Sequence, residues 1–130
     1  MIVVDASVAV DLLLRAPGAD QLTERILSAG EALHAPHLLD VEVTQVLRRH
    51  AMSGRLSPAR GRAAVDLLRA MPIVRHGHAA LTARAWALRT NLTAYDAVYI
   101  ALAEILDATL LTRDERLAAA PGHRARVEVR

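Results

Sequence analysis

The sequence contains no cysteine, no lysine and no phenylalanine, and each absence excludes a class of chemistry. Without cysteine there are no disulfides, thiolate metal ligands or cysteine nucleophiles, which suits a reducing compartment. Without lysine, Walker-type phosphate loops and Schiff-base enzymes are excluded. All 16 basic side chains are therefore arginines, which bind phosphate groups bidentately, so the composition is compatible with a polyanionic partner.

Aromatic residues and long apolar runs are also scarce. Aromatics make up only 2% of the chain, so Leu, Val, Ile and Ala must build the core. No stretch approaches the ~20 apolar residues that span a bilayer, and the apolar start is too short and too acidic for a signal peptide. With 130 residues, 53% of them hydrophobic, we predict one cytoplasmic domain over residues 1–130.

Short apolar runs alternate with segments whose apolar residues recur at helical spacing. Thr93 and Asp107 are predicted to bound one helix, and Asn91 to end the helix before it in a left-handed conformation. Such alternation with short turns predicts parallel pairing, and hence an α/β domain with a mostly parallel sheet. Strands are predicted at 2–4, 32–35, 72–75, 109–111 and 126–129, and helices at 8–14, 20–28, 37–51, 58–70, 79–89, 94–106 and 113–120.

Two acidic residues occupy positions where a carboxylate is either useful or costly. Asp5 closes the first apolar strand, and ligands of open α/β sheets bind just outside the carboxyl ends of strands. Alternatively, Asp5 or Ser7 caps the helix that follows. Glu42 falls on the apolar face of its predicted helix, where an unpaired charge is expensive. Its carboxylate must therefore bind a metal, a water or a partner side chain. A buried ion pair with an arginine is the alternative to a functional role.

Two further acids lie near the start of predicted helices. Asp96 stands third after Thr93, as in a capping box, although its helix is otherwise almost wholly apolar. Asp114 follows a predicted buried strand. Thr112 and Glu115 can form a capping box there by themselves, which leaves Asp114 either to complement the helix dipole or to take part in a site.

These four acids can converge at one end of a parallel sheet. Carboxylates clustered without a lysine repel one another unless a cation compensates, and oxygen ligands select Mg²⁺ or Mn²⁺. Such a site supports hydrolysis of a phosphodiester by an activated water. Asp5, Asp96 and Asp114 would bind the metal directly or through water. Glu42 would be a ligand or the general base, and Ser7 and Thr112 would hold ligands or waters from the second shell.

Other polar features are weaker candidates. His76-Gly77-His78 lacks the further ligands of a zinc site and is predicted to be an exposed loop. Four other acids are predicted to be helix-surface or terminal residues: Asp11, Asp40, Asp66 and Asp107. Asp40 is the least securely excluded of these because it lies two residues from Glu42.

Four stretches, in this order, resemble the PIN-domain family and, within it, the VapC toxins of prokaryotic toxin–antitoxin pairs. Together they cover essentially the whole chain at the family's usual length. They are Ile2-Val3-Val4-Asp5-Ala6-Ser7-Val8, Pro36-His37-Leu38-Leu39-Asp40-Val41-Glu42-Val43, Leu92-Thr93-Ala94-Tyr95-Asp96-Ala97-Val98-Tyr99-Ile100-Ala101-Leu102-Ala103 and Leu110-Leu111-Thr112-Arg113-Asp114-Glu115-Arg116-Leu117.

The resemblance implies a three-layer α/β/α domain with a parallel sheet of about five strands and an Mg²⁺- or Mn²⁺-dependent endoribonuclease activity. By position, Asp5, Glu42, Asp96 and Asp114 correspond to the family's acidic quartet. Proteins of this kind form homodimers and are silenced by a cognate antitoxin, in heterotetramers or larger complexes, with the antitoxin's tail in the acidic groove. The scarcity of aromatics departs from an RNA-binding composition, so RNA recognition would rest mainly on arginine contacts and RNA shape.

Two other functions compete with this interpretation. A binding module that keeps the fold without catalysis would lack one of the acids, and here all four are present. A phosphoryl-transfer domain that phosphorylates an Asp after a strand relies on a lysine, which this chain does not have.

Overall fold

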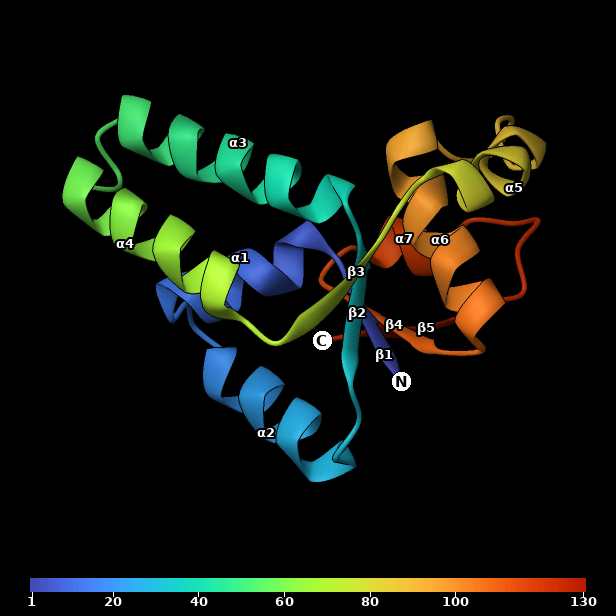
Figure 1. Cartoon of the computed structure of the whole chain (residues 1–130), viewed down its shortest axis with the longest axis horizontal. Coiled ribbons are helices and arrows are strands. Elements are labelled where there is room, and N and C mark those ends of the chain that lie inside the picture. Colours follow the sequence, from blue (N-terminus) through green and yellow to red (C-terminus); the bar gives the residue numbers. More distant parts are fainter.

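The computed structural model describes residues 1–130, and at its centre is a five-stranded sheet in which every pair of strands is parallel (Figure 1). The strand order is β3-β2-β1-β4-β5. The chain thus builds outward from β1 first to one side and then to the other, which makes β1 the topological switch point. The strands are β1 (Ile2–Val4), β2 (Leu33–Pro36), β3 (Ile73–His76), β4 (Thr109–Thr112) and β5 (Arg126–Val129).

Helices cover both faces of this sheet, which confirms the predicted three-layer α/β/α fold. In Figure 1, α1 to α4 lie on one side of the sheet, and α5, α6 and α7 lie on the other. The helices are α1 (Ala6–Leu14), α2 (Ala19–Ala29), α3 (Leu38–Met52), α4 (Pro58–Ala70), α5 (Thr82–Ala87), α6 (Ala94–Leu106) and α7 (Glu115–Ala119), with a 3₁₀ turn, η1 (Ala79–Leu81), before α5.

The core forms where β1 meets the helices of both layers. Ile2, Val3 and Val4 have no exposed surface, as expected for three β-branched residues in a strand covered on both faces. α6 contacts β1, β2 and β4, and its residues 97–103 are all buried. This burial fixes the position of the first turn of α6 relative to the end of β1.

The segment between β3 and α6 differs from the prediction. Instead of one helix over 79–89, the chain forms η1 and then the short helix α5, which ends at Ala87. Leu88 is only 1% exposed, and its carbonyl accepts the N–H groups of Asn91 and Leu92, so burial of Leu88 ends the helix early. Asn91 is not left-handed, and the predicted terminator is wrong; Asp107 does end α6 in that conformation.

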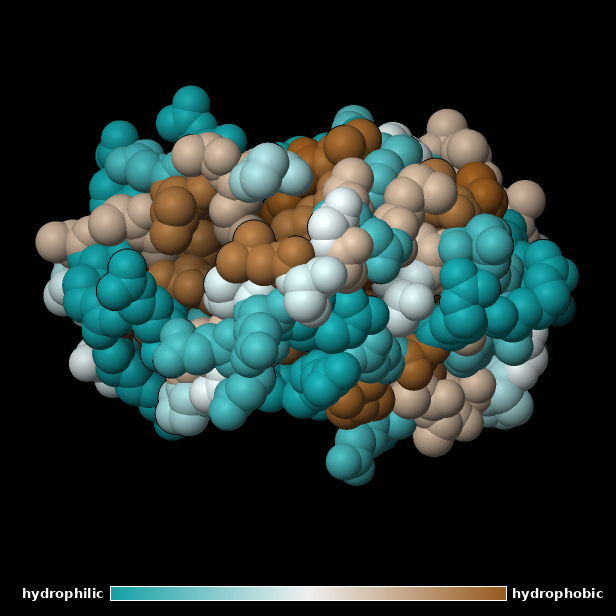
Figure 2. All heavy atoms as spheres, turned by 90° about the horizontal axis from the view of Figure 1, so that it is seen from below, coloured by the Kyte–Doolittle hydropathy of each residue, from teal (hydrophilic) through white to brown (hydrophobic).

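The face seen in Figure 2 carries hydrophobic side chains among the polar ones. A hollow bounded by α1, α2 and α4 is lined mostly by hydrophobic residues, of which Leu27 and Leu67 are largely exposed. None of the helices combines the length and the apolar composition that crossing a bilayer requires.

Candidate active site

Asp5 leaves the carboxyl end of β1 and is 8% exposed. One carboxylate oxygen accepts the Val8 N–H at 3.1 Å and the Ser7 hydroxyl, so Asp5 does cap α1. The other oxygen accepts the Thr112 hydroxyl. Burial raises the pKa of Asp5, and the hydrogen bonds from Ser7 and Thr112 counter that effect. Capping therefore occupies only part of this carboxylate and does not exclude a role in a site.

The two hydroxyls that bind Asp5 also connect it to the start of α7. The Ser7 oxygen accepts the Arg113 N–H at 3.0 Å, and the Thr112 oxygen accepts the Asp114 N–H at 3.0 Å. Thr112 belongs to β4 and does not cap α7, so the predicted capping box of Thr112 and Glu115 is wrong. Asp114 caps the helix itself by accepting the Arg116 N–H at 2.9 Å.

Glu42 lies in the second turn of α3 and is partly buried, as its place on the apolar face predicts. It forms no ion pair with an arginine, so that alternative is wrong. Its partner is Tyr99 of α6, whose hydroxyl donates to Glu42 Oε1 at 2.6 Å. Burial raises the pKa of Glu42, the bond from Tyr99 lowers it, and repulsion from Asp96 and Asp5 raises it again. Sequence reasoning missed Tyr99, although it follows Asp96 by three residues and so shares its helix face.

Asp96 stands in the first turn of α6. Its N–H donates to the Thr93 hydroxyl at 3.2 Å, but no bond returns from the Thr93 N–H to the Asp96 carboxylate. Only half of the predicted capping box is formed. Burial raises the pKa of Asp96 and repulsion from Asp114 adds to the rise, whereas the Thr93 side chain lowers the pKa of the Asp96 carboxyl.

The four acids are therefore electrostatic neighbours at one edge of the sheet. Asp5 and Asp96 repel Glu42, and Asp114 repels Asp96. The topology explains this proximity, because β1 and β4 are adjacent parallel strands and both end here. Two hollows open at this edge, one lined by Asp96 and Asp114 and the other by Glu42.

The donors suit a hard divalent cation in type and in charge. All four are carboxylates, the ligands that Mg²⁺ and Mn²⁺ prefer, and a cation would relieve the repulsion that raises the pKa of Glu42 and Asp96. Only Asp114 has an arginine partner, Arg116, which lowers the pKa of Asp114. No three acidic or histidine side chains are arranged here in a geometry that would hold a metal ion. A metal would therefore draw the carboxylates closer together.

Comparison with known proteins identifies the family. A family model described as the PIN domain matches residues 2–122. The chain belongs to the PIN domain family. It is similar to ribonuclease VapC9 of Mycobacterium tuberculosis, with 47% identity over 117 residues, which are 90% of this chain and 88% of the relative. Ribonuclease VapC1 of the same species is also 47% identical, over 92% of this chain and 90% of the relative.

A solved structure shares the architecture of this PIN domain at low identity. It is the VapBC2 structure from Rickettsia felis bound to a DNA fragment from its promoter. The TM-score is 0.72 with 15% identity, and the match covers 99% of this chain and 98% of that one. At this identity the likeness bears on the fold alone, and it agrees with the α/β/α layers described above.

The four acids that were predicted to be helix-surface or terminal residues each form an ion pair with an arginine. Asp40 lies close to Glu42 in sequence but turns away to a bidentate pair with Arg75, with N–O distances of 2.7 and 3.0 Å. The others form the pairs Asp11–Arg113, Asp66–Arg62 and Asp107–Arg126. Their charges are balanced locally, unlike those of Asp5, Glu42 and Asp96.

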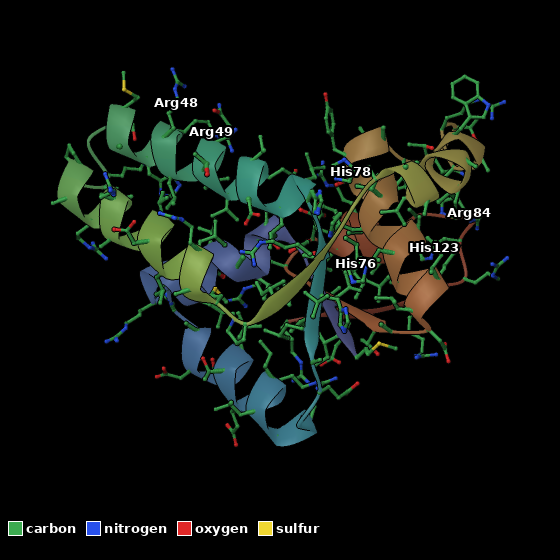
Figure 3. The ribbon with its side chains drawn as sticks, viewed as in Figure 1. Arg48, Arg49, His76, His78, Arg84 and His123 are labelled. Carbon is green, nitrogen blue, oxygen red and sulfur yellow. The ribbon has the colours of Figure 1, made fainter.

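The histidines do not form the exposed loop that was predicted. His76 is part of β3 and shares a 2.9 Å hydrogen bond with His34 of β2 (Figure 3). His78 accepts the Leu38 N–H at 2.9 Å and thereby satisfies a free donor in the first turn of α3. Both rings are partly buried because β2 and β3 are adjacent in the sheet. The spacing of the histidines in the sequence does not predict this pairing of strands.

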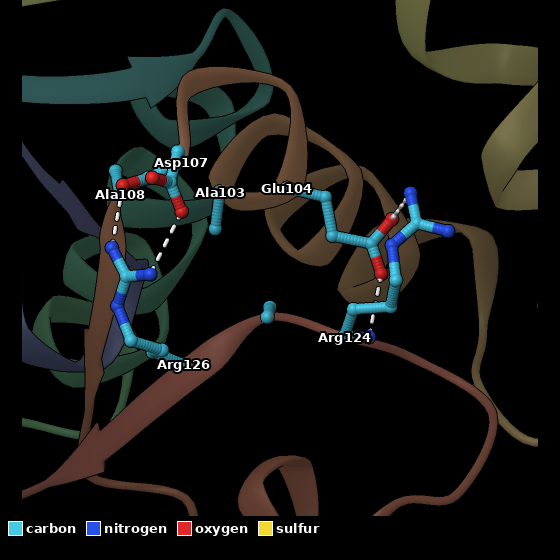
Figure 4. A pocket seen from close by; sticks show the side chains of 7 residues that line it. Ala103, Glu104, Asp107, Ala108, Arg124 and Arg126 are labelled. Atoms are coloured by element: carbon cyan, nitrogen blue, oxygen red, sulfur yellow. Dashed lines mark hydrogen bonds and ion pairs between the residues drawn. The ribbon is translucent and has the colours of Figure 1, made fainter.

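A further pocket lies at the opposite edge of the sheet, where β4 and β5 begin (Figure 4). Its charges are already paired: Arg126 donates to Asp107, and the Arg124 N–H donates to Glu104. This pocket lies at the amino ends of β4 and β5, at the other edge of the sheet from the candidate site. It has no unpaired charge that could act on a substrate.

Proposed function

We propose that the chain is a metal-dependent endoribonuclease, the toxin of a toxin–antitoxin pair, with its site at Asp5, Glu42, Asp96 and Asp114. The observation that carries this proposal is the position of Asp5, buried at the end of the switch-point strand and held there by Ser7 and Thr112. The names of the VapC relatives, at 47% identity, support ribonuclease activity. RNA is the substrate, and its phosphodiester bond is hydrolysed.

Asp5, Asp96 and Asp114 are the residues proposed to hold Mg²⁺ or Mn²⁺. When bound, the metal polarises the phosphoryl oxygens and lowers the pKa of water. Ser7 and Thr112 fix the orientation of the Asp5 carboxylate, as polar neighbours of ligands do. Asp114 must release Arg116 to become a ligand, and this exposed pair is weak enough to open.

Glu42 is placed either to bind the metal or to accept the proton of the attacking water. Tyr99 occupies Oε1 only, and Oε2 makes no hydrogen bond within the protein. The raised pKa of Glu42 makes it a stronger base than a free carboxylate.

The proposed partners are RNA, a second copy of the chain and a cognate antitoxin. The Rickettsia felis VapBC2 structure, which shares the fold, is bound to a DNA fragment from its promoter, and a Klebsiella pneumoniae structure with the same fold is a toxin–antitoxin complex. An unpaired group of carboxylates would attract a basic antitoxin segment, and an arginine in that segment would compete with the metal. A binding module without catalysis is the alternative function, and cleavage decides between the two.

The test is cleavage of a mixed RNA pool by purified, antitoxin-free protein with Mg²⁺, with Mn²⁺ and with chelator. We expect metal-dependent cutting that Asp5→Asn and Asp96→Asn abolish. Asp66→Asn, which changes an exposed acid in a surface pair, is the matched control and should cut as the wild type does. Cutting by all variants alike would trace the activity to a contaminant, and no cutting by folded wild type would favour the binding module.

A further inference from the structure

The hollow beside Glu42 carries features that the carboxylate site does not use. It lies between α3 and the start of α6 and has a volume of about 340 Å³, within the range of ligand sites. Glu42, Arg49 and Tyr95 line it together, with Gln45 between the first two along α3. An acid of the proposed site, a cation and an aromatic ring therefore share one cavity.

Arg49 is free to bind an anion there. It is exposed and makes no ion pair or hydrogen bond, whereas Arg113 and Arg116, the other arginines near the carboxylates, each pair with an acid. Glu42 and Arg49 are seven residues apart, so they share a face of α3 about 10 Å apart along its axis. Side chains in a helix lean toward its N-terminus, which directs Arg49 toward Glu42.

Tyr95 presents an aromatic surface at the same hollow. Its side chain is 65% exposed and makes no hydrogen bond, although it directly precedes Asp96. Tyr99, one turn further along α6, is only 2% exposed and is committed to Glu42. In a chain with 2% aromatics, an exposed ring next to a site acid stands out as a stacking surface.

We propose that this hollow binds single-stranded RNA next to the carboxylates, with Arg49 contacting a phosphate and Tyr95 stacking on a base. The inference rests on the proposed function and extends it to substrate positioning. Carboxylates repel a polyanion, so the strand needs a cation beside them, and Arg49 supplies one within the hollow. An unstacked base is required to reach the ring, which favours a single strand over a duplex.

The charge contact is tested with Arg49→Gln against Arg48→Gln. Arg48 is the neighbouring residue, is equally exposed and unpaired, and does not line the hollow (Figure 3). Binding of a dye-labelled pool of short RNA is titrated in chelator at several salt concentrations. We expect Arg49→Gln alone to weaken binding, with the slope of log K against log salt reduced by about 1. With metal, it should raise KM and leave kcat unchanged.

The stacking contact is tested with Tyr95→Leu against Tyr95→Phe. The leucine variant should lose roughly 5- to 150-fold in affinity, which corresponds to the 1–3 kcal/mol of one base–aromatic stack, and the phenylalanine variant should bind as the wild type does. An abasic oligonucleotide should bind wild type and Tyr95→Leu equally. Far-ultraviolet circular dichroism and thermal melting check that each variant folds.

Two results would overturn the inference while the proposed function stands. One is equal binding by Arg49→Gln and Arg48→Gln in a protein that cleaves RNA with metal. The other is a change in sedimentation of the RNA-free Tyr95→Leu or Arg49→Gln protein, which would assign the hollow to an interface between copies. If the folded wild type neither binds nor cleaves RNA, the proposed function fails and this inference fails with it.

Discussion

At the scale of the residue, Glu42 shows how a site can be kept at the expense of stability. Its carboxylate is partly buried, has no arginine partner and faces two other acids. Only the Tyr99 hydroxyl stabilises its charged form directly. The folded chain without metal therefore disfavours the ionised state, which is the state that a ligand or a general base needs.

We expect Glu42→Gln to stabilise the metal-free protein at pH 7 by about 1 kcal/mol, the usual gain when a strained functional group is neutralised. The amide oxygen can still accept the Tyr99 hydroxyl. Because folding raises the pKa of Glu42, the ionised carboxylate destabilises the wild type as pH rises above the unfolded value near 4.5. Urea denaturation in chelator should thus show the two proteins equal near pH 4 and diverging toward pH 7. A less stable variant at pH 7 would contradict this account.

At the scale of the element, local signals predicted the start of α4 and both ends of α6. α6 begins and ends where the sequence predicts, because Thr93 caps it through a bond three residues away and Asp107 closes it. α4 likewise starts at Pro58 after the Ser57 cap. In both cases the decisive hydrogen bonds are made within one helical turn.

Contacts between residues far apart in the sequence could not be predicted. Thr112 looked like a helix cap, but its hydroxyl binds Asp5, 107 residues away, which leaves Asp114 to cap α7. Tyr99 and Glu42 are separated by 57 residues, and nothing near either residue indicates the other. The site acids were found by their positions after strands and on apolar faces, whereas their partners depend on the packing of separate elements.

Glu104 of α6 also makes contacts that depend on the packing of separate elements, because it binds α5 and the segment before β5. Its side chain is 4% exposed and accepts two bonds from Arg84. It also accepts the Arg124 N–H, a bond that Figure 4 shows. We expect Glu104→Gln to cost about 2 kcal/mol, the scale of hydrogen bonds to a charged group, in urea denaturation at pH 7. Asp66→Asn, which opens an exposed pair, should cost no more than about 0.5 kcal/mol.

The ion pair of Glu104 with Arg84 makes the free energy of unfolding depend on pH. Arg84 lowers the pKa of Glu104, so the pair of Glu104 with Arg84 contributes fully to the free energy of unfolding above the unfolded pKa near 4.5. That contribution is lost as the pH falls through the pKa of Glu104 in the folded protein. The difference in the free energy of unfolding between wild type and Glu104→Gln should therefore disappear at acidic pH. A gap that persists unchanged below pH 3 would assign the effect to packing.

At the scale of the whole molecule, the site joins segments from both ends and the middle of the chain. Burial in the assembled fold raises the pKa values of Asp5, Glu42 and Asp96, and repulsion between neighbouring acids adds to the rise for Glu42 and Asp96. A cation that binds only this assembled state must stabilise the fold as well as the reaction.

We therefore expect Mn²⁺ to raise the melting temperature of the apo protein, with a gain of about 2.7 kcal/mol when its concentration is 100 times Kd. Asp5→Asn should abolish the shift, and Asp66→Asn should retain it. Thermal melting with and without chelator provides the measurement. An equal shift in Asp5→Asn would mean that the ion binds elsewhere.

The place of β1 at the centre of the sheet also bears on how the protein is made. β1 leaves the ribosome before β4, its neighbour on one side, which is synthesised more than a hundred residues later. Until then the nascent chain exposes an unpaired apolar strand edge, and Asp5 lacks the Thr112 hydroxyl. Translation that stalls before Thr109 yields a fragment without Asp114 or an intact sheet. The proposed site therefore cannot assemble before β4 and Asp114 have been synthesised.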